Sequence, residues 1–179
     1  MLNKTNRKLI VGSEILFVSN NLLTQFAKDH DIFTFHHNEK DSLDTTARHI
    51  WRDLKSYLIK DYDHIVFMGF KDDSDIVFKL NEDRNLLFDA AVFVNYEPTG
   101  EIDSLALSID KLTQAQVNLY SFGYGGKKNR LDGLVENHQS LPIWTNLRSE
   151  RLAQEIYGCV VYGTYKQVSL SGTNTEFIR

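Results

Sequence analysis

The residues that bear most directly on chemistry lie in one short run near the middle of the chain. The apolar segment His64–Met68 has the composition of a buried strand, Gly69 follows it at once, and a helix-like segment begins near Asp75. In α/β enzymes a nucleophile occupies a sharp strand-to-helix turn of this kind, where its reactive atom is exposed. The third position of the turn, counted from Gly69, is Lys71. The sequence therefore predicts a catalytic turn without the serine or cysteine that would attack a substrate.

Lys71 and Ser74 each allow a chemical role and a structural role. The amine of Lys71 could attack a substrate or hold a phosphate, but a lysine nucleophile needs desolvation or a cationic neighbour. The adjacent Asp72 and Asp73 favour the charged amine instead, which indicates a solvated or salt-bridged loop lysine. Ser74 could be a displaced nucleophile. At a helix start, its oxygen would accept hydrogen bonds from the first free N–H groups, and we favour this capping role.

Candidates for a general base and for an acid lie elsewhere in the chain. His138 stands in a polar segment before the last predicted helix and is the candidate base. Glu97, just after the apolar run Phe88–Val94, is the candidate acid, and Asp132 is its alternative. A loop histidine and surface carboxylates would explain the same residues. A rearranged Ser74–His138–Glu97 site for ester or thioester hydrolysis therefore stays open as an alternative function.

A glycine-rich segment with two lysines, Gly123–Lys128, invites a nucleotide-binding interpretation. Glycines let a backbone approach a phosphate closely and lysines supply charge, so Gly123, Gly125, Gly126 and Lys127 are candidate ligand-binding residues. The spacing matches neither the P-loop nor the dinucleotide-binding fingerprint. A flavodoxin-like or Rossmann-like nucleotide binder is the second alternative function.

The histidines His36 and His37 suggest a metal site with the nearby Glu39. Adjacent residues at a strand end point to opposite faces, so the two histidines are poorly placed to share one ion. The spacing of a zinc site is missing, and the single cysteine, Cys159, has no cysteine partner. We expect no metal and no cofactor.

The elements that must position these residues alternate between strand and helix along the chain. Strands are predicted at Lys8–Val18, Ile32–Phe35, His64–Met68, Phe88–Val94 and Gln116–Phe122, and helices at Asn20–His30, Asp41–Tyr62, Asp75–Leu80, Ile102–Leu112 and Leu147–Tyr157. The alternative for Lys8–Val18 is a hairpin that turns at Gly12 and Ser13. The segment Gly158–Tyr162 is either a strand or the end of the last helix. This alternation predicts a single three-layer α/β domain, with a mostly parallel sheet of about six strands and helices on both faces. The site of such a fold lies beyond the carboxyl ends of the strands.

The order of elements over roughly Leu9–Val161 resembles the α/β-hydrolase fold in a small form without a cap domain. In this resemblance Gly69 falls on the first glycine of the G-x-S-x-G turn, Lys71 on its serine and Asp73 on its second glycine. The segment Ile15–Asn20 falls on a strand and the oxyanion loop that follows it, which makes Asn20, Gly69 and Lys71 candidate ligand-binding residues.

The resemblance also implies that His138 is the one retained member of a catalytic triad, because no carboxylate follows closely after the strand that ends at Phe122. An elbow without a nucleophile has no reason to stay strained, and Asp73 in place of a glycine favours a relaxed turn. The resemblance therefore implies a catalytically degenerate hydrolase relative that acts by binding a partner protein or a small ligand.

Composition limits the remaining classes of function. The chain has 179 residues, of which 42% are hydrophobic and 25% are charged, and its net charge is −4. This charge gives no attraction to nucleic acid or to anionic membranes. No apolar run approaches the roughly 18 residues of a membrane span, and Gly12–Glu14 interrupts the only segment that resembles a leader. We expect a cytoplasmic protein with an α/β domain at residues 1–162 and a polar tail at residues 163–179.

Overall fold

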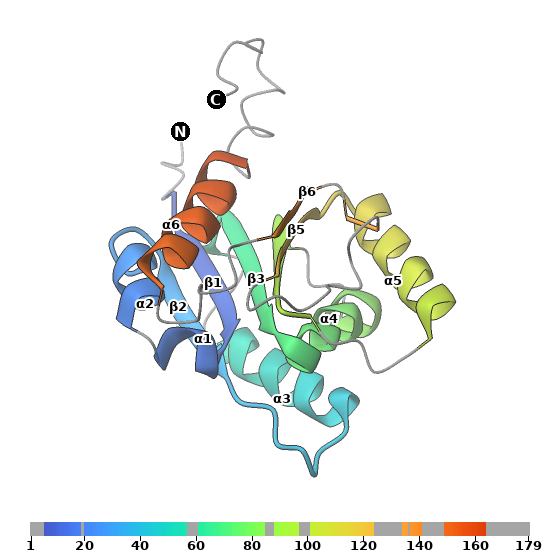
Figure 1. Ribbon diagram of the computed structural model, residues 1–179. Coiled ribbons are helices and arrows are strands. Elements are labelled where there is room, and N and C mark those ends of the chain that lie inside the picture. The colour runs from blue at the N-terminus through green and yellow to red at the C-terminus, as the bar shows by residue number, and fades with distance from the viewer. Residues whose placement is uncertain are drawn as a thin grey trace, which may run out of the picture.

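The computed structural model describes residues 6–18, 20–56, 61–84, 88–96, 101–123, 134–135, 137–140 and 149–163. In these residues six parallel strands form one sheet in the order β2-β1-β3-β4-β5-β6 (Figure 1). The strands are β1 (Lys8–Ser13), β2 (Asp31–Phe35), β3 (His64–Phe70), β4 (Ala90–Val94), β5 (Asn118–Gly123) and β6 (Asn137–Ser140). The predicted parallel sheet is confirmed.

Helices cover both faces of this sheet (Figure 1). One face carries α1 (Glu14–Val18), α2 (Asn20–Phe26) and α6 (Glu150–Gly158), and the other carries α3 (Leu43–Ser56), α4 (Ile76–Arg84) and α5 (Ile102–Gln114). Along β3, Ile65 and Phe67 face the core under α3, α4 and α5, whereas Val66 and Met68 face the core under α1, α2 and α6. This alternation explains why the strand is apolar throughout, as strands buried on both faces are. The predicted three-layer α/β architecture is confirmed.

The helix α3 illustrates how the sequence fixes an element locally. Its residues Ala47, Ile50 and Leu54 recur at helical spacing and are buried against the sheet. The helix begins at Leu43 because the hydroxyl of Ser42 accepts a hydrogen bond from the backbone N–H of Thr45, at 3.1 Å. The start predicted at Asp41 was therefore early, while the buried stripe was predicted correctly.

The first strand is shorter than its sequence predicts. β1 ends at Ser13, and the residues predicted to extend it to Val18 form the helix α1. Leu16 and Phe17 are buried together, whereas Ile15 and Val18 are 48% and 71% exposed, which is not the alternation of a strand. Packing of this adjacent pair onto the sheet overrides the strand propensity of an Ile-Leu-Phe-Val run.

The end of the domain also differs from the prediction. His138 lies on the strand β6, opposite Ser121 of β5, and not in a loop. Backbone pairing with β5 places this polar segment in the sheet, although its composition does not favour a strand. Of the two options for Gly158–Tyr162, the helical one is confirmed, because α6 continues into the π-helical turn η3 (Cys159–Gly163). Residues 164–179 lie outside the described part, so the polar tail stays a prediction.

Within the described residues, no helix combines the length and the apolar character that crossing a membrane requires.

Candidate functional site

The carboxyl ends of the parallel strands meet at one edge of the sheet, which we call the carboxyl edge. His36 and His37 follow β2, Lys71 follows β3, Asn95 follows β4 and Gly123 is the last residue of β5. The register places these ends side by side, with Phe70 opposite Val94 and Val94 opposite Phe122. The prediction that these segments share one edge is confirmed for the described residues.

The chain turns sharply at Lys71, which has a φ of 51° and begins the 3₁₀ helix η2 (Lys71–Asp75). A residue other than glycine in this left-handed region carries strain of about 1–2 kcal/mol. The sequence predicted that the turn had relaxed, and this prediction is wrong. The backbone is strained at this strand-to-helix turn, and a lysine occupies the strained position.

Gly69 explains why the turn stays sharp. A Cβ atom at residue 69 would lie 2.5 Å from Cα of Ser74 and 2.6 Å from its Oγ, so only a glycine permits this approach. The helix η2 therefore folds back directly over the end of β3. The tight contact depends on the first glycine of the turn, and Asp73 in place of the second glycine is compatible with it.

Ser13 supports the turn from the neighbouring strand. It is fully buried at the end of β1, and its Oγ accepts a hydrogen bond from the backbone N–H of Phe70 at 3.1 Å. The Ser13 hydroxyl also hydrogen-bonds to the carboxyl group of Asp73. One side chain thus links the residue before Lys71 to a residue after it, which holds the turn in place.

Asp73 is a titratable residue at this edge, and its surroundings raise its pKa. Burial raises its pKa, the hydrogen bond from Ser13 opposes this rise, and the negative charge of Asp72 adds to it. His37 and His36 lower the pKa of Asp73 through their charges. His37 is held by Thr46, with Nδ1 2.8 Å from Oγ1, so a group from α3 fixes one histidine near the turn.

Lys71 and Ser74 behave differently from each other in this turn. The ammonium of Lys71 lies 5.5 Å from the centre of the Phe70 ring, and Lys71 has no ion pair with any described residue. Ser74 is 0% exposed, and its Oγ has no hydrogen-bond partner among the described residues. The predicted capping role of Ser74 is wrong, because the helix begins at Lys71 and Ser74 lies inside it, with Oγ facing Gly69.

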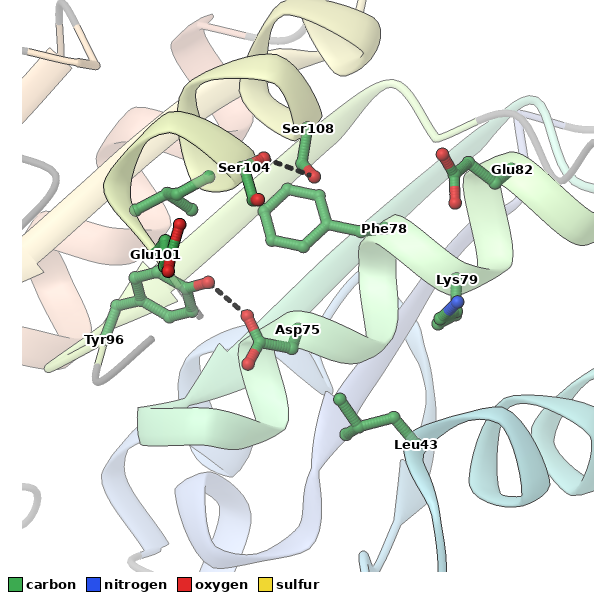
Figure 2. A pocket seen from close by; sticks show the side chains of 10 residues that line it. Leu43, Asp75, Phe78, Lys79, Glu82, Tyr96, Glu101, Ser104 and Ser108 are labelled. Atoms are coloured by element: carbon green, nitrogen blue, oxygen red, sulfur yellow. Dashed lines mark hydrogen bonds between the residues drawn. The ribbon is translucent and has the colours of Figure 1, made fainter. Parts of the chain in front are cut away.

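A pocket of about 210 Å³ adjoins the turn, between α4 and α5 (Figure 2). Asp75, the last residue of η2, lines it together with Phe78 and Tyr96, and the hydroxyl of Tyr96 donates a hydrogen bond to the Asp75 carboxylate. Burial and this hydrogen bond raise the pKa of Tyr96, so its hydroxyl remains protonated. We call this the elbow pocket, because η2 carries Lys71 at one end and a pocket-lining residue at the other.

The structure brings together only part of the predicted site. Gly69, Lys71 and Ser74 share one turn, and Gly123 ends a strand at the same edge. Asn20 opens the helix α2, as predicted, but it follows the helix α1 and not a strand, because β1 ends at Ser13. The backbone of His138 lies on β6. The remaining predicted residues lie outside the described part of the chain, and their roles stay predictions: Glu97, Gly125, Gly126, Lys127 and Asp132.

Sequence reasoning missed Ser13, Asp75 and Tyr96 as site residues. Ser13 follows the apolar run Leu9–Val11 and could have been found as the end of a buried strand. The contact between Asp75 and Tyr96 has no sequence signal, because it depends on how β3 and β4 lie in the sheet. Within the described ranges, no three His, Cys, Asp or Glu side chains gather closely enough to hold a metal ion.

Comparisons with known proteins agree with this geometry at the level of the fold. No family model matches the sequence, and no curated protein sequence matches it either. A predicted CIB-like hydrolase from Thermoplasma acidophilum superposes with a TM-score of 0.55 and 12% identity, covering 89% of each chain. The peroxisomal alpha-beta-hydrolase Lpx1 from Saccharomyces cerevisiae superposes with a TM-score of 0.57 and 9% identity, covering 98% of this chain and 81% of that one. The chain therefore has an α/β-hydrolase-like fold, which confirms the fold inferred from the order of elements.

The close approach of Gly69 to Ser74 predicts that a side chain at residue 69 destabilises the fold. Gly69→Ala should lower the free energy of unfolding by about 2–3 kcal/mol, because the added methyl group meets the main chain of η2. Urea denaturation followed by circular dichroism measures this loss. Gly158→Ala is the matched control, since a Cβ atom there meets nothing within 4 Å. A loss in Gly69→Ala no larger than in the control would contradict the close approach.

The strain at Lys71 predicts a gain of stability when it is removed. Lys71→Gly should raise the free energy of unfolding by up to about 1 kcal/mol, because glycine adopts a positive φ at little cost. Gln116→Gly, at a φ of 61° beyond the end of α5, relieves the same conformation far from the turn and serves as the control. If Gln116→Gly is stabilising and Lys71→Gly is not, the lysine side chain itself stabilises the fold.

The raised pKa of Asp73 predicts a pH-dependent stability. The folded protein binds the proton of the Asp73 carboxyl group more tightly than the unfolded chain does. The stability that this proton contributes is therefore lost as pH rises from about 4 through the folded-state pKa. Asp73→Asn removes this titration, and the variant should gain stability relative to wild type as pH rises through that window. Urea denaturation of both proteins between about pH 3.5 and 7 measures the difference. A difference that does not vary with pH would show that Asp73 is not perturbed.

Proposed function

We propose that this protein is a catalytically degenerate hydrolase-fold protein that acts by binding a partner or a small ligand at the elbow. One observation carries the proposal: Lys71 begins the 3₁₀ helix after β3 with a φ of 51°, at the position to which the resemblance assigns a nucleophile. Strained backbone persists where the surrounding structure enforces it, and it concentrates at functional sites. The turn thus keeps its geometry while the residue that it presents has no hydroxyl or thiol.

The charge of Lys71 supports recognition of an acidic group. A lysine ammonium is a compact point charge on a flexible stem, which suits a carboxylate or a phosphate approached from solvent. The side chain is half-buried and forms no ion pair with the described residues, so its charge is available to a ligand.

The elbow pocket supports a small occupant. Its volume of about 210 Å³ is below the range of about 300–1,000 Å³ that is usual for drug-sized ligands. A small ligand or one side chain of a partner protein fits this space better than an extended substrate. Phe78 and Tyr96 supply apolar surface, and Asp75 supplies a fixed acceptor. The net charge of −4 and the single cysteine agree with a cytoplasmic protein that binds neither nucleic acid nor membranes.

Hydrolysis with a rearranged site is the alternative, and both similar structures are named as hydrolases. It requires Ser74 as the nucleophile, with His138 as the base and Glu97 or Asp132 as the acid. A nucleophile must reach the substrate, whereas Ser74 is fully buried against Gly69. The nucleotide-binding alternative rests on a segment of which only Gly123 is described, and no observation favours it.

Labelling with a fluorophosphonate tests the loss of catalysis. The wild-type protein should not be labelled, and hydrolysis of p-nitrophenyl esters should be the same in wild type and in Ser74→Ala. The variant is expected to fold, because the hydroxyl that it loses has no partner among the described residues. A serine esterase in the same reaction is the positive control. Labelling of the wild type that disappears in Ser74→Ala would overturn the proposal in favour of the hydrolase.

The same proposal predicts that small acidic ligands bind at the turn that carries Lys71. In a screen of carboxylate- and phosphate-bearing fragments by protein NMR, ligands should shift the backbone resonances of η2. Lys71→Met should weaken this binding roughly tenfold, because a charged hydrogen bond is lost. Lys55→Met removes an exposed charge from α3 and is the matched control. Equal binding in both variants would show that Lys71 is not the contact.

A further inference from the structure

The strand β2 forms one edge of the sheet, and β6 forms the other. On one side β2 pairs with β1 in five consecutive parallel steps, from Leu9 with Asp31 to Ser13 with Phe35. Backbone N–H and C=O groups along a strand alternate between its two sides, so the second side of β2 presents donors and acceptors directed away from β1. Among the described residues, no strand pairs with that side.

The edge of β2 lacks the features that usually prevent a sheet edge from pairing. Proteins protect such edges with lysine, proline, a bulge or a very short strand. β2 reads Asp-Ile-Phe-Thr-Phe, its register with β1 is unbroken, and its central residues Ile32 and Phe33 are only half-buried. The opposite edge strand, β6, has four residues and reads Asn-His-Gln-Ser. The apolar edge of β2 is therefore the one suited to a further strand.

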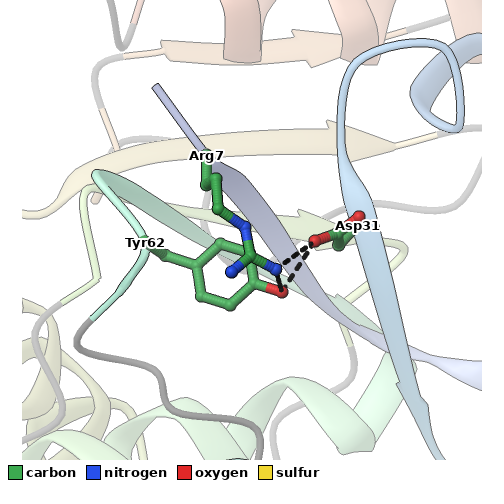
Figure 3. A network of polar contacts seen from close by, with 3 residues as sticks. All are labelled: Arg7, Asp31 and Tyr62. Carbon is green, nitrogen blue, oxygen red and sulfur yellow. Dashed lines mark hydrogen bonds and ion pairs between the residues drawn. The ribbon is translucent and has the colours of Figure 1, made fainter. Parts of the chain in front are cut away.

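The single charge on β2 is balanced within the protein, at the start of the strand (Figure 3). Nη2 of Arg7 donates to Oδ2 of Asp31 and to the hydroxyl oxygen of Tyr62, each at 3.1 Å. The Tyr62 hydroxyl donates to the same Asp31 oxygen at 2.7 Å. Hydrogen bonds from Tyr62 and Arg7 lower the pKa of Asp31, so the ion pair persists at neutral pH. Because the two charges compensate each other, neither repels a chain that approaches β2.

A pocket of about 500 Å³ lies beside β2, at the end of the sheet where the strands begin, which we call the amino edge. Four consecutive residues of β2, 31–34, line this amino-edge pocket. Successive side chains of a strand point to opposite faces. The side chain of Ile32 packs on the α6 face, whereas Leu9 and Leu54, which also line the pocket, belong to the core on the α3 face. The pocket therefore reaches the backbone of β2, and a chain paired with β2 would pass beside it.

The lining of the amino-edge pocket favours an uncharged, apolar side chain. Leu9 and Leu54 are buried in the core, and Phe33 packs against the same core while still lining the pocket. The charged groups in the lining, Arg7 and Asp31, bind each other. An occupant thus gains apolar contact and has no unbalanced charge of this pair to neutralise.

A separate peptide fits this edge better than a second copy of the chain does. Two copies paired through β2 about a two-fold axis would each bring only β2 to the other. The aromatic residues of that strand, Phe33 and Phe35, already pack in the core of their own copy. Such a pairing would bring no spare apolar side chain to the pocket.

We propose that β2 is the docking strand for an extended peptide segment of a partner protein. The peptide adds to the sheet as a further strand and places one apolar side chain in the amino-edge pocket. In recognition by strand addition, main-chain hydrogen bonds supply affinity and pockets for alternate side chains supply specificity. This site makes no use of Lys71 or the elbow pocket, so it and the proposed function at the elbow can fail separately.

A library of random heptapeptides displayed on phage is the first probe. Selection against the whole chain should enrich sequences in which apolar and polar residues alternate. The most enriched peptide, synthesised with blocked ends, should shift the amide resonances of Ile32, Phe33 and Thr34 in ¹H–¹⁵N NMR. Enrichment of no sequence, or shifts confined to other parts of the protein such as η2, would overturn the proposal.

N-methylation of the selected peptide tests whether its backbone makes the contact. One version carries methyl groups at alternate residues, and a second carries them at the residues between. The version whose methyl groups face β2 loses its donors and should bind about tenfold more weakly or worse, whereas the other should keep its affinity. Equal affinities of the two versions would show that side chains alone are recognised, and would overturn strand addition.

Replacement of each apolar residue of the peptide by Asp tests the pocket. One position should lose about tenfold or more in affinity, because a charge there would be buried against Leu9 and Leu54. A scan in which no position stands out would contradict the placement of a side chain in the pocket.

A pair of variants locates the site on the protein. Thr34→Lys places a lysine at an exposed position of the edge strand, which opposes pairing, and should weaken peptide binding about tenfold or more. Thr24→Lys adds the same charge to an exposed position of α2 and should leave binding unchanged. Equal binding by both variants would overturn the proposal. The N-methyl comparison uses the wild type, so it keeps the proposal testable if Thr34→Lys does not fold.

Analytical ultracentrifugation of the free protein tests the other occupant. The wild type should sediment as a monomer. A dimer that dissociates in Thr34→Lys but not in Thr24→Lys would show that a second copy occupies the edge of β2, and would overturn the proposal.

Discussion

Gly69 and Ser74 approach each other so closely that a side chain at residue 69 would lie 2.5 Å from Cα of Ser74. This contact holds η2 over the end of β3. It thereby sets the direction of α4, which packs on the α3 face of the sheet. It also leaves Lys71 at the apex of the turn with a φ of 51°. The positions of Lys71, the candidate ligand contact, and of Asp75 in the wall of the elbow pocket both follow from this constraint.

The backbone geometry of the turn does not depend on the side chain at its apex. Ser13 and Asp73 brace the backbone on either side of Lys71, and this support does not involve the side chain at the apex. A lysine can therefore occupy the apex without changing the scaffold, at the cost of strain in the left-handed region. The α/β-hydrolase-like fold is shared with structures of 12% and 9% identity, which is why fold alone does not specify the activity.

The two ends of the sheet differ in their electrostatics. At the carboxyl edge, Lys71 has no ion pair with any described residue, and burial raises the pKa of the nearby Asp73. At the amino edge, Arg7 and Asp31 are locked together with Tyr62, and Arg7 stays protonated throughout the physiological range. The first arrangement leaves a cation without a described ion-pair partner, whereas the second pairs its cation within the protein.

The sequence by itself determined the alternation of elements, the buried character of β3 and the identity of the residue at the turn, because periodicity and composition are local properties. Only the tertiary structure decided that Leu16 and Phe17 form a helix, that His138 lies on a strand, and that the turn remains strained. Each of these depends on contacts between segments that are far apart or on backbone pairing, and propensity does not encode them. Ser13 and Tyr96 became site residues for the same reason: parallel strands bring their ends together across long stretches of chain.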